Sequence, residues 1–74
     1  MNHSRSSAVD HDRAVCACLS QALGTLRLSI ANGRPMSLPN AIRLCQRLLA
    51  TAEVPAQVKP AALRRMQEAY RRLL

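Results

Sequence analysis

The stretch SLPNAIRLCQRLLATA, residues 37–52, decides the fold class, because its apolar residues recur at intervals of three and four. That spacing places them on one face of an α-helix and predicts that this face is buried. The apolar face consists of Leu38, Ala41, Ile42, Leu44, Cys45, Leu48, Leu49 and Ala52. The solvated face consists of Asn40, Arg43, Gln46, Arg47 and Thr51. We expect the helix to start near Ser37, because Pro39 is tolerated in a first turn, with Leu48 central on the buried face.

A second helix is predicted upstream, over residues 8–31. Its buried stripe consists of Val15, Leu19, Leu23, Leu26 and Ile30. Ser7 followed by Asp10 resembles a capping box at the start of this helix, and the Asn-Gly pair at residues 32–33 is typical of a helix end. Gly24 lies inside the helix, where it either costs up to about 1 kcal/mol or permits a close helix crossing.

A third helix is predicted from Pro60 to the chain end, after a proline-containing loop with one possible helical turn. Its apolar face consists of Leu63, Met66, Ala69, Tyr70, Leu73 and Leu74. The three helices predict one all-α domain over residues 7–74, a small bundle with short Pro- and Gly-containing connectors. Residues 1–6 are polar and are predicted to form a flexible tail.

The charge of the chain predicts an anionic partner. Eleven basic residues stand against four acidic ones, for a net charge of +7, and ten of the eleven are arginine. Arginine binds phosphates and carboxylates equally well, so nucleic acid and an acidic protein both remain open. The basic surface is assigned to Arg43 and Arg47 on the middle helix and to Arg64, Arg65, Arg71 and Arg72 on the last, with Arg65 at the border of its polar face. Base reading is not favoured, because Gln67 is the only exposed amide on the last helix and Tyr70, the only aromatic residue, faces the core.

The sequence does not favour metal binding, catalysis or membrane insertion. The three cysteines, Cys16, Cys18 and Cys45, lack the paired spacing of a metal site and are interpreted as small core residues, so neither metal nor cofactor is expected. Catalysis is not expected either, because His3 and His11 lie in or near the tail and no carboxylate pair occupies a plausible pocket. A signal segment and a run of 18 apolar residues are both missing. These features predict a cytoplasmic protein without a membrane or small-molecule partner.

Asp12 suggests where a partner could bind. It lies in line with Leu19, Leu23 and Ile30, so it continues the apolar stripe of the first helix with a carboxylate. Either the core ends at Val15 and Asp12 caps an exposed turn, or Asp12 stands at the rim of a groove that binds a partner peptide through an amine or apolar anchors. The groove hypothesis names Ser7, Val9, Asp12, Arg13, Val15 and Cys16.

The run SSAVDHDRAVCACLSQAL, residues 6–23, together with the arginine-rich end and the overall length, resembles small transcription regulators made by lytic phages. The resemblance implies a protein of the host bacterial cytoplasm that binds host RNA polymerase at the N-terminal segment of the β′ subunit, near the RNA exit channel. It implies inhibition of sigma-dependent initiation and suppression of termination. The alternative is a small, basic, helical DNA-binding protein similar to a repressor.

Overall fold

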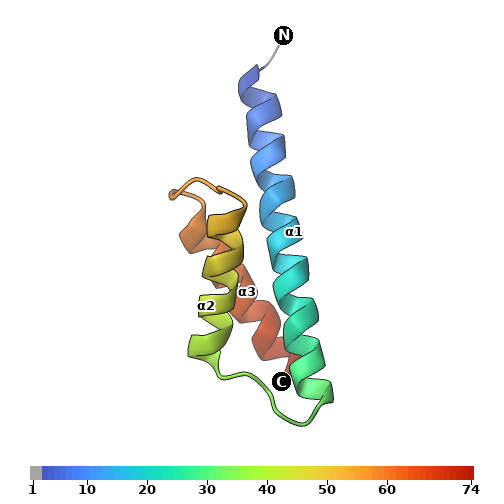
Figure 1. The fold of residues 1–74 in the computed structure, drawn as a ribbon. Helices are drawn as coiled ribbons and strands as arrows, with labels where there is room; N and C mark the ends of the chain where they lie inside the picture. Colours follow the sequence, from blue (N-terminus) through green and yellow to red (C-terminus); the bar gives the residue numbers. More distant parts are fainter. Residues whose placement is uncertain (1–2) are drawn as a thin grey trace.

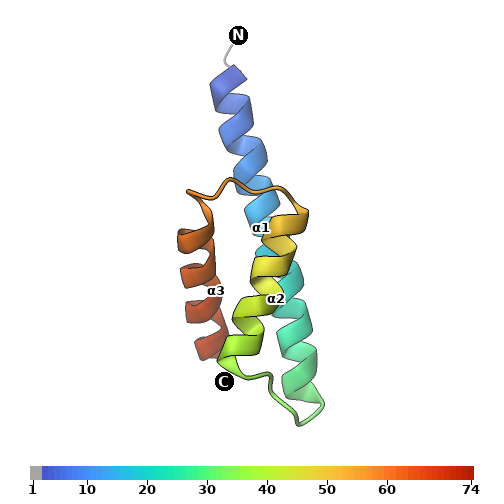
Figure 2. The same ribbon diagram turned by 60° about the vertical axis from the view of Figure 1, so that its left-hand side comes forward.

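A computed structural model describes the backbone of residues 3–74 and the side chains of residues 11–74. Over this part the chain forms three helices and no strand: α1 (His3–Ala31), α2 (Leu38–Thr51) and α3 (Lys59–Leu73). Each helix contacts the other two. α1 and α3 run in the same general direction and α2 runs in the opposite direction (Figures 1 and 2). The prediction of a small all-α bundle is therefore confirmed.

α1 begins at His3, five residues earlier than predicted. Residues 3–6, which were expected in the tail, are helical, and Ser7 and Asp10 lie inside α1. The prediction of a capping box at Ser7 was therefore wrong. The physical reason is that residues 3–10 contain neither proline nor glycine, so nothing in their backbone preferences ends a helix there.

α1 is much longer than its neighbours and gives the molecule an elongated shape. Its 29 residues span about 43 Å, whereas the 14 residues of α2 span about 21 Å. The N-terminal part of α1 extends past the connection between α2 and α3 (Figures 1 and 2). The overall extents are 50 × 19 × 17 Å. The radius of gyration is 13.3 Å, against about 11 Å for a compact chain of this length.

The core is aliphatic apart from one tyrosine. Its buried residues are Val15, Cys18, Leu19, Ala22 and Leu26 from α1, Ala41, Cys45 and Leu49 from α2, Val54 from a connector, and Ala62, Met66 and Tyr70 from α3. Tyr70 is 1% exposed, which confirms that it faces the core. Of the residues predicted as apolar faces, Leu23, Ile30 and Leu48 are only partly buried, while Ala52 and Leu74 are exposed. Those two predictions were wrong because both residues lie beyond the last turn of their helix.

α1 and α2 end in the same type of hydrogen-bonded turn, which leads into each connector. At the end of α1, the Arg34 N–H donates to the Ser29 carbonyl and the Gly33 N–H donates to the Ile30 carbonyl, both at 3.0 Å. Gly33 takes the left-handed conformation that this motif requires, with φ of 74°. The predicted helix end at residues 32–33 is thus confirmed. At the end of α2 the left-handed position is held by Glu53, with φ of 57°.

Hydrogen bonds with α1 and α3 fix the connector between α1 and α2 at Met36. The Met36 N–H donates to Ser29 Oγ at 3.3 Å, and that hydroxyl donates to the Leu26 carbonyl at 2.7 Å. The Tyr70 hydroxyl donates to the Met36 carbonyl. These bonds hold the Met36 backbone at the base of α2, between α1 and α3.

Candidate functional site

A depression lies between α1 and α3, where α3 begins. It has a volume of about 290 Å³. Its lining residues are His11, Asp12 and Val15 from α1, Val58 from the end of the preceding connector, and Ala61, Ala62 and Arg65 from α3. The floor is apolar, because Val15 and Ala62 are buried, and the exposed Ala61 adds a small apolar side chain to the lining.

Charges of opposite sign border this depression. Asp12 is exposed on α1 and Arg65 is exposed on α3, so the two helices contribute a carboxylate and a guanidinium respectively. Asp12 lies in the third turn of α1, because α1 begins at His3. The interpretation of Asp12 as a cap near the helix start is therefore wrong, and its side chain borders the depression instead.

A second depression continues along the same pair of helices. It has a volume of about 270 Å³ and is lined by Cys16, Leu19, Ser20 and Leu23 from α1 and by Arg65 and Ala69 from α3. Arg65 borders both depressions, so they adjoin. We call the pair the α1–α3 groove. Its α1 wall, from His11 to Leu23, is about 18 Å long at the helical rise of 1.5 Å per residue.

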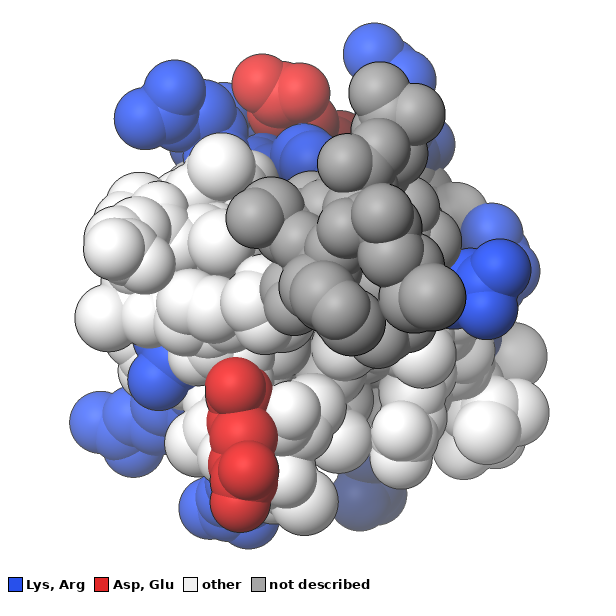
Figure 3. All heavy atoms as spheres, turned by 90° about the horizontal axis from the view of Figure 1, so that it is seen from above, with Lys and Arg blue, Asp and Glu red and all other residues white. Residues whose placement is uncertain are grey.

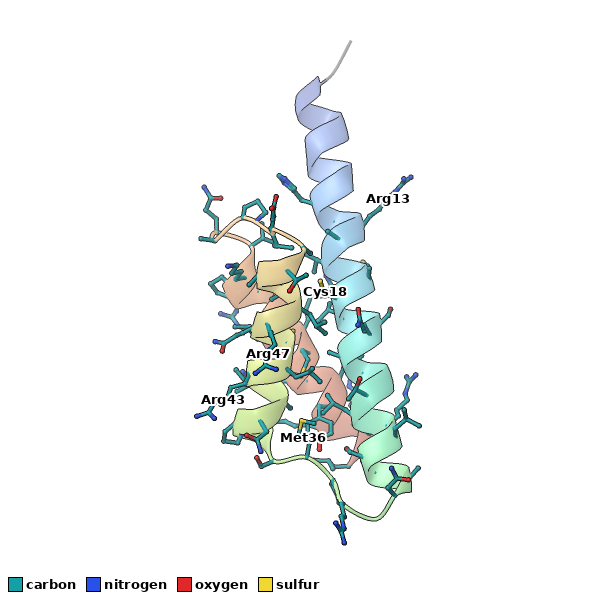
Figure 4. All side chains as sticks on the ribbon, in the orientation of Figure 1. Arg13, Cys18, Met36, Arg43 and Arg47 are labelled. Carbon is teal, nitrogen blue, oxygen red and sulfur yellow. The ribbon has the colours of Figure 1, made fainter. Side chains whose placement is uncertain are left out.

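The structure brings together half of the groove residues that the sequence predicts. Asp12, Val15 and Cys16 line the α1–α3 groove. Arg13 is exposed and points away from α2, and it lines neither depression of the groove (Figure 4). Ser7 and Val9 belong to α1, but their side chains lie outside the described residues. The α3 wall, with Val58, Ala61, Ala62 and Ala69, was missed by sequence reasoning.

The predicted basic surface is exposed but is not one patch. Arg43, Arg47, Arg64, Arg65, Arg71 and Arg72 are all exposed. Seen along the bundle from the N-terminal end, Lys and Arg side chains emerge on several sides of the outline (Figure 3). Arg43 and Arg47 border a separate depression at the base of α2, together with Met36, Asn40 and Leu44 (Figure 4). We call this depression, of about 330 Å³, the α2 hollow.

The cysteines divide into two buried thiols and one exposed thiol, and all three are free. Cys18 and Cys45 are buried, as predicted for core residues, and the Cys18 thiol donates to the Leu48 carbonyl at 3.4 Å. Burial, and secondarily the nearby Cys18 thiol, raise the pKa of Cys45. Cys16 is exposed, so its assignment to the core was wrong. The reason is that the core-facing positions of α1 at this level are Val15, Cys18 and Leu19.

Two further observations concern metal binding and membrane insertion. Among the described residues, no three His, Cys, Asp or Glu side chains are grouped so that they could hold a metal ion. The segment His11–Ala31 of α1 is long and apolar enough to cross a membrane by length and composition. Core helices of soluble bundles share this property, and one face of the segment forms the core of this bundle.

Comparison with known proteins identifies no relative. No family model matches the chain, and no curated protein and no solved structure is significantly similar to it. The inference of function therefore rests on the chemistry of the exposed surfaces and on the resemblance carried by residues 6–23.

Proposed function

We propose that this protein is a binding module without catalytic activity, whose α1–α3 groove receives a segment of a protein partner. The observation that carries this proposal is an apolar floor between two walls of opposite charge. Interfaces gain most of their affinity from apolar anchors in desolvated pockets, while rim charges select the partner. The α1–α3 groove offers both elements.

The groove chemistry specifies the partner segment. An apolar side chain fits over Val15 and Ala61, where the floor lacks polar groups. A basic residue of the partner would pair with Asp12, and an acidic residue would pair with Arg65, because each wall offers one charge. Such a segment contains a basic residue, an apolar anchor and an acidic residue in succession, and it lies across the groove.

A protein partner is favoured over duplex or single-stranded nucleic acid by two observations. The arginines emerge on several sides of the molecule (Figure 3), whereas a phosphate backbone is gripped by basic residues gathered on one face. Tyr70, the only aromatic residue, is 1% exposed, so it offers no surface on which a base could stack. The repressor-like alternative thus has weaker support.

The partner that we propose is bacterial RNA polymerase, at the N-terminal segment of its β′ subunit. Its support is the resemblance of residues 6–23, together with the arginine-rich end and the overall length, to phage regulators that inhibit sigma-dependent initiation and suppress termination. That run overlaps the α1 wall of the groove, which extends from His11 to Leu23. On this proposal the protein acts in the cytoplasm of the host bacterium.

Calorimetry with purified β′ N-terminal fragment tests the proposal. Ala61→Gln places a longer side chain over the apolar floor, and we expect it to weaken binding at least about tenfold, which corresponds to about 1.4 kcal/mol. Ala50→Gln is the matched control, because Ala50 is also an exposed helical alanine and lies on α2. The control should leave the dissociation constant nearly unchanged. Equal effects of the two variants would exclude the groove as the binding surface.

Transcription assays test which partner the protein binds, separately from which surface it uses. The intact protein should reduce sigma-dependent initiation and increase read-through at a terminator, and Ala61→Gln should weaken both effects. A protein that binds duplex DNA with base preference, and does not bind polymerase, would instead support the repressor-like alternative.

A further inference from the structure

The α2 hollow is independent of the α1–α3 groove. It is lined by Met36 from the first connector and by Asn40, Arg43, Leu44 and Arg47 from α2. The α1–α3 groove contains no residue of α2. The α2 hollow and the α1–α3 groove therefore share neither a lining side chain nor a helix.

The floor of the α2 hollow is apolar and its position is fixed. The Met36 backbone is held by hydrogen bonds to Ser29 of α1 and Tyr70 of α3, and Leu44 is half-buried against the core. Methionine side chains adapt their shape to an apolar group that packs on them. The hollow thus combines an anchored backbone with an adaptable apolar surface.

The rim of the hollow is basic and its arginines are free to bind. Arg43 and Arg47 are exposed and lie one helical turn apart (Figure 4). Within residues 11–74, the side-chain hydrogen bonds are donated by Cys18, Thr25, Ser29, Thr51 and Tyr70, and none by an arginine. One side chain in this part of the chain also accepts a hydrogen bond: Ser29 Oγ accepts from the Met36 backbone N–H. Among these residues, therefore, neither guanidinium group has an internal hydrogen bond that an external anion would have to break.

The charges and the floor together select one kind of occupant. A second copy of this chain would bring a further +7 charge toward the arginines, so like-charge repulsion opposes self-association at this surface. A nucleic-acid strand could contact the arginines through phosphates, but it would leave Met36 and Leu44 without an apolar partner. An acidic peptide with an apolar side chain matches both the rim and the floor.

We infer that the α2 hollow is a second binding site, which accepts an acidic protein segment. One apolar residue of that segment packs on Met36 and Leu44, and flanking carboxylates pair with Arg43 and Arg47, whose planar guanidinium groups bind carboxylates through two parallel hydrogen bonds. Asn40 provides an amide at the same rim for a backbone group of the peptide. The site makes the protein bivalent: two acidic or mixed-charge segments can bind at once.

The test is a nuclear magnetic resonance titration of the intact protein with defined probes. The first probe is a capped peptide with a central leucine and two glutamates on each side. The second is the same peptide with glutamines in place of the glutamates, and the third is a short oligothymidylate. We expect the acidic peptide to shift the amide signals of residues 36–47. The glutamine peptide should bind at least about tenfold more weakly, because it lacks the carboxylates that pair with Arg43 and Arg47.

Matched variants locate the site. The double substitution Arg43→Gln with Arg47→Gln should weaken the acidic peptide at least about tenfold. Arg71→Gln with Arg72→Gln removes the same charge from α3 and should change affinity less than about threefold, as expected for screened charges. Met36→Ala should also weaken binding, because it removes part of the apolar floor.

Three outcomes would overturn the inference. Equal losses in the two double variants would show general charge attraction. An unchanged affinity in Met36→Ala, with a folded protein confirmed by circular dichroism, would show that the apolar floor is not used. Tighter binding of oligothymidylate that depends on Arg43 and Arg47 would assign the hollow to nucleic acid.

Discussion

Single small residues decide how closely the helices of this bundle pack. Ala22, Ala41 and Ala62, one from each helix, are almost completely buried, so only a methyl group separates each backbone from its neighbours at these points. Gly24 is different: a Cβ added there would meet no side chain and no neighbouring helix within 4 Å. The hypothesis that Gly24 permits a close helix crossing was therefore wrong, and its effect is the ordinary cost of glycine inside a helix.

Replacing Gly24 by alanine should stabilise the protein. Alanine restricts the unfolded chain and has space in the folded helix, so Gly24→Ala should add about 0.5–1 kcal/mol to the free energy of unfolding. For a domain of this size, thermal melting should shift upward by about 4–8 °C per kcal/mol. Gly33→Ala is the contrasting variant and should destabilise, because φ of 74° disfavours a Cβ. A lower melting temperature for Gly24→Ala would indicate an unseen contact at that face of α1.

At the scale of elements, periodicity predicted the existence of the helices better than the extent of their buried faces. The middle helix was placed to within one residue at each end, because Ser37 and Pro39 signal its start and its polar face is continuous. The predicted stripe of α1 was too narrow: Val15, Leu19 and Leu26 are buried as predicted, but Ala22 is buried as well, whereas Leu23 and Ile30 are only partly so. The cause is that α1 packs on two helices at once, so its buried face is wider than one stripe and does not follow the largest side chains.

The difference between Leu49 and Leu48 tests this packing. Leu49 is 0% exposed, whereas Leu48 is only partly buried although the sequence places it at the centre of the apolar face. Leu49→Ala should cost about 2–5 kcal/mol, a large part of the stability of so small a domain, and Leu48→Ala should cost less because its site is partly solvated. Urea denaturation of the two variants measures both values. An equal or larger loss for Leu48→Ala would contradict the packing.

Only one wall of the candidate groove could be predicted from the sequence. Asp12 and Val15 could be placed on one face of a helix from their spacing, and Arg65 could be placed at the border of its polar face. The opposite wall, formed by Val58 and Ala61, could not be predicted, because helical periodicity shows which face is buried but not which helix covers it.

At the scale of the whole molecule, the arginines are dispersed, whereas the apolar lining is confined to depressions. The arginines emerge on several sides (Figure 3), so they attract an anionic partner from many directions without forming one docking face. The α1–α3 groove lies where α1 and α3 run side by side, and its apolar lining lies between Asp12 and Arg65. Dispersed charge of this kind accelerates encounter, whereas apolar contacts in a groove retain the partner.

The salt dependence of partner binding by two alanine variants tests most directly whether the groove, rather than the arginines, retains the partner. Binding of the polymerase β′ N-terminal fragment is measured by calorimetry for Asp12→Ala and Arg71→Ala, at about 0.1 M salt and at several times that concentration. Asp12 lines the groove, whereas Arg71 lines neither the α1–α3 groove nor the α2 hollow. Asp12→Ala should weaken binding more at both salt concentrations, because a partner encloses that carboxylate. The effect of Arg71→Ala should nearly vanish at high salt, since screening acts over about 10 Å at 0.1 M and over shorter distances as salt rises. A larger loss for Arg71→Ala at both concentrations would contradict the account and make the arginines of α3 the primary binding surface.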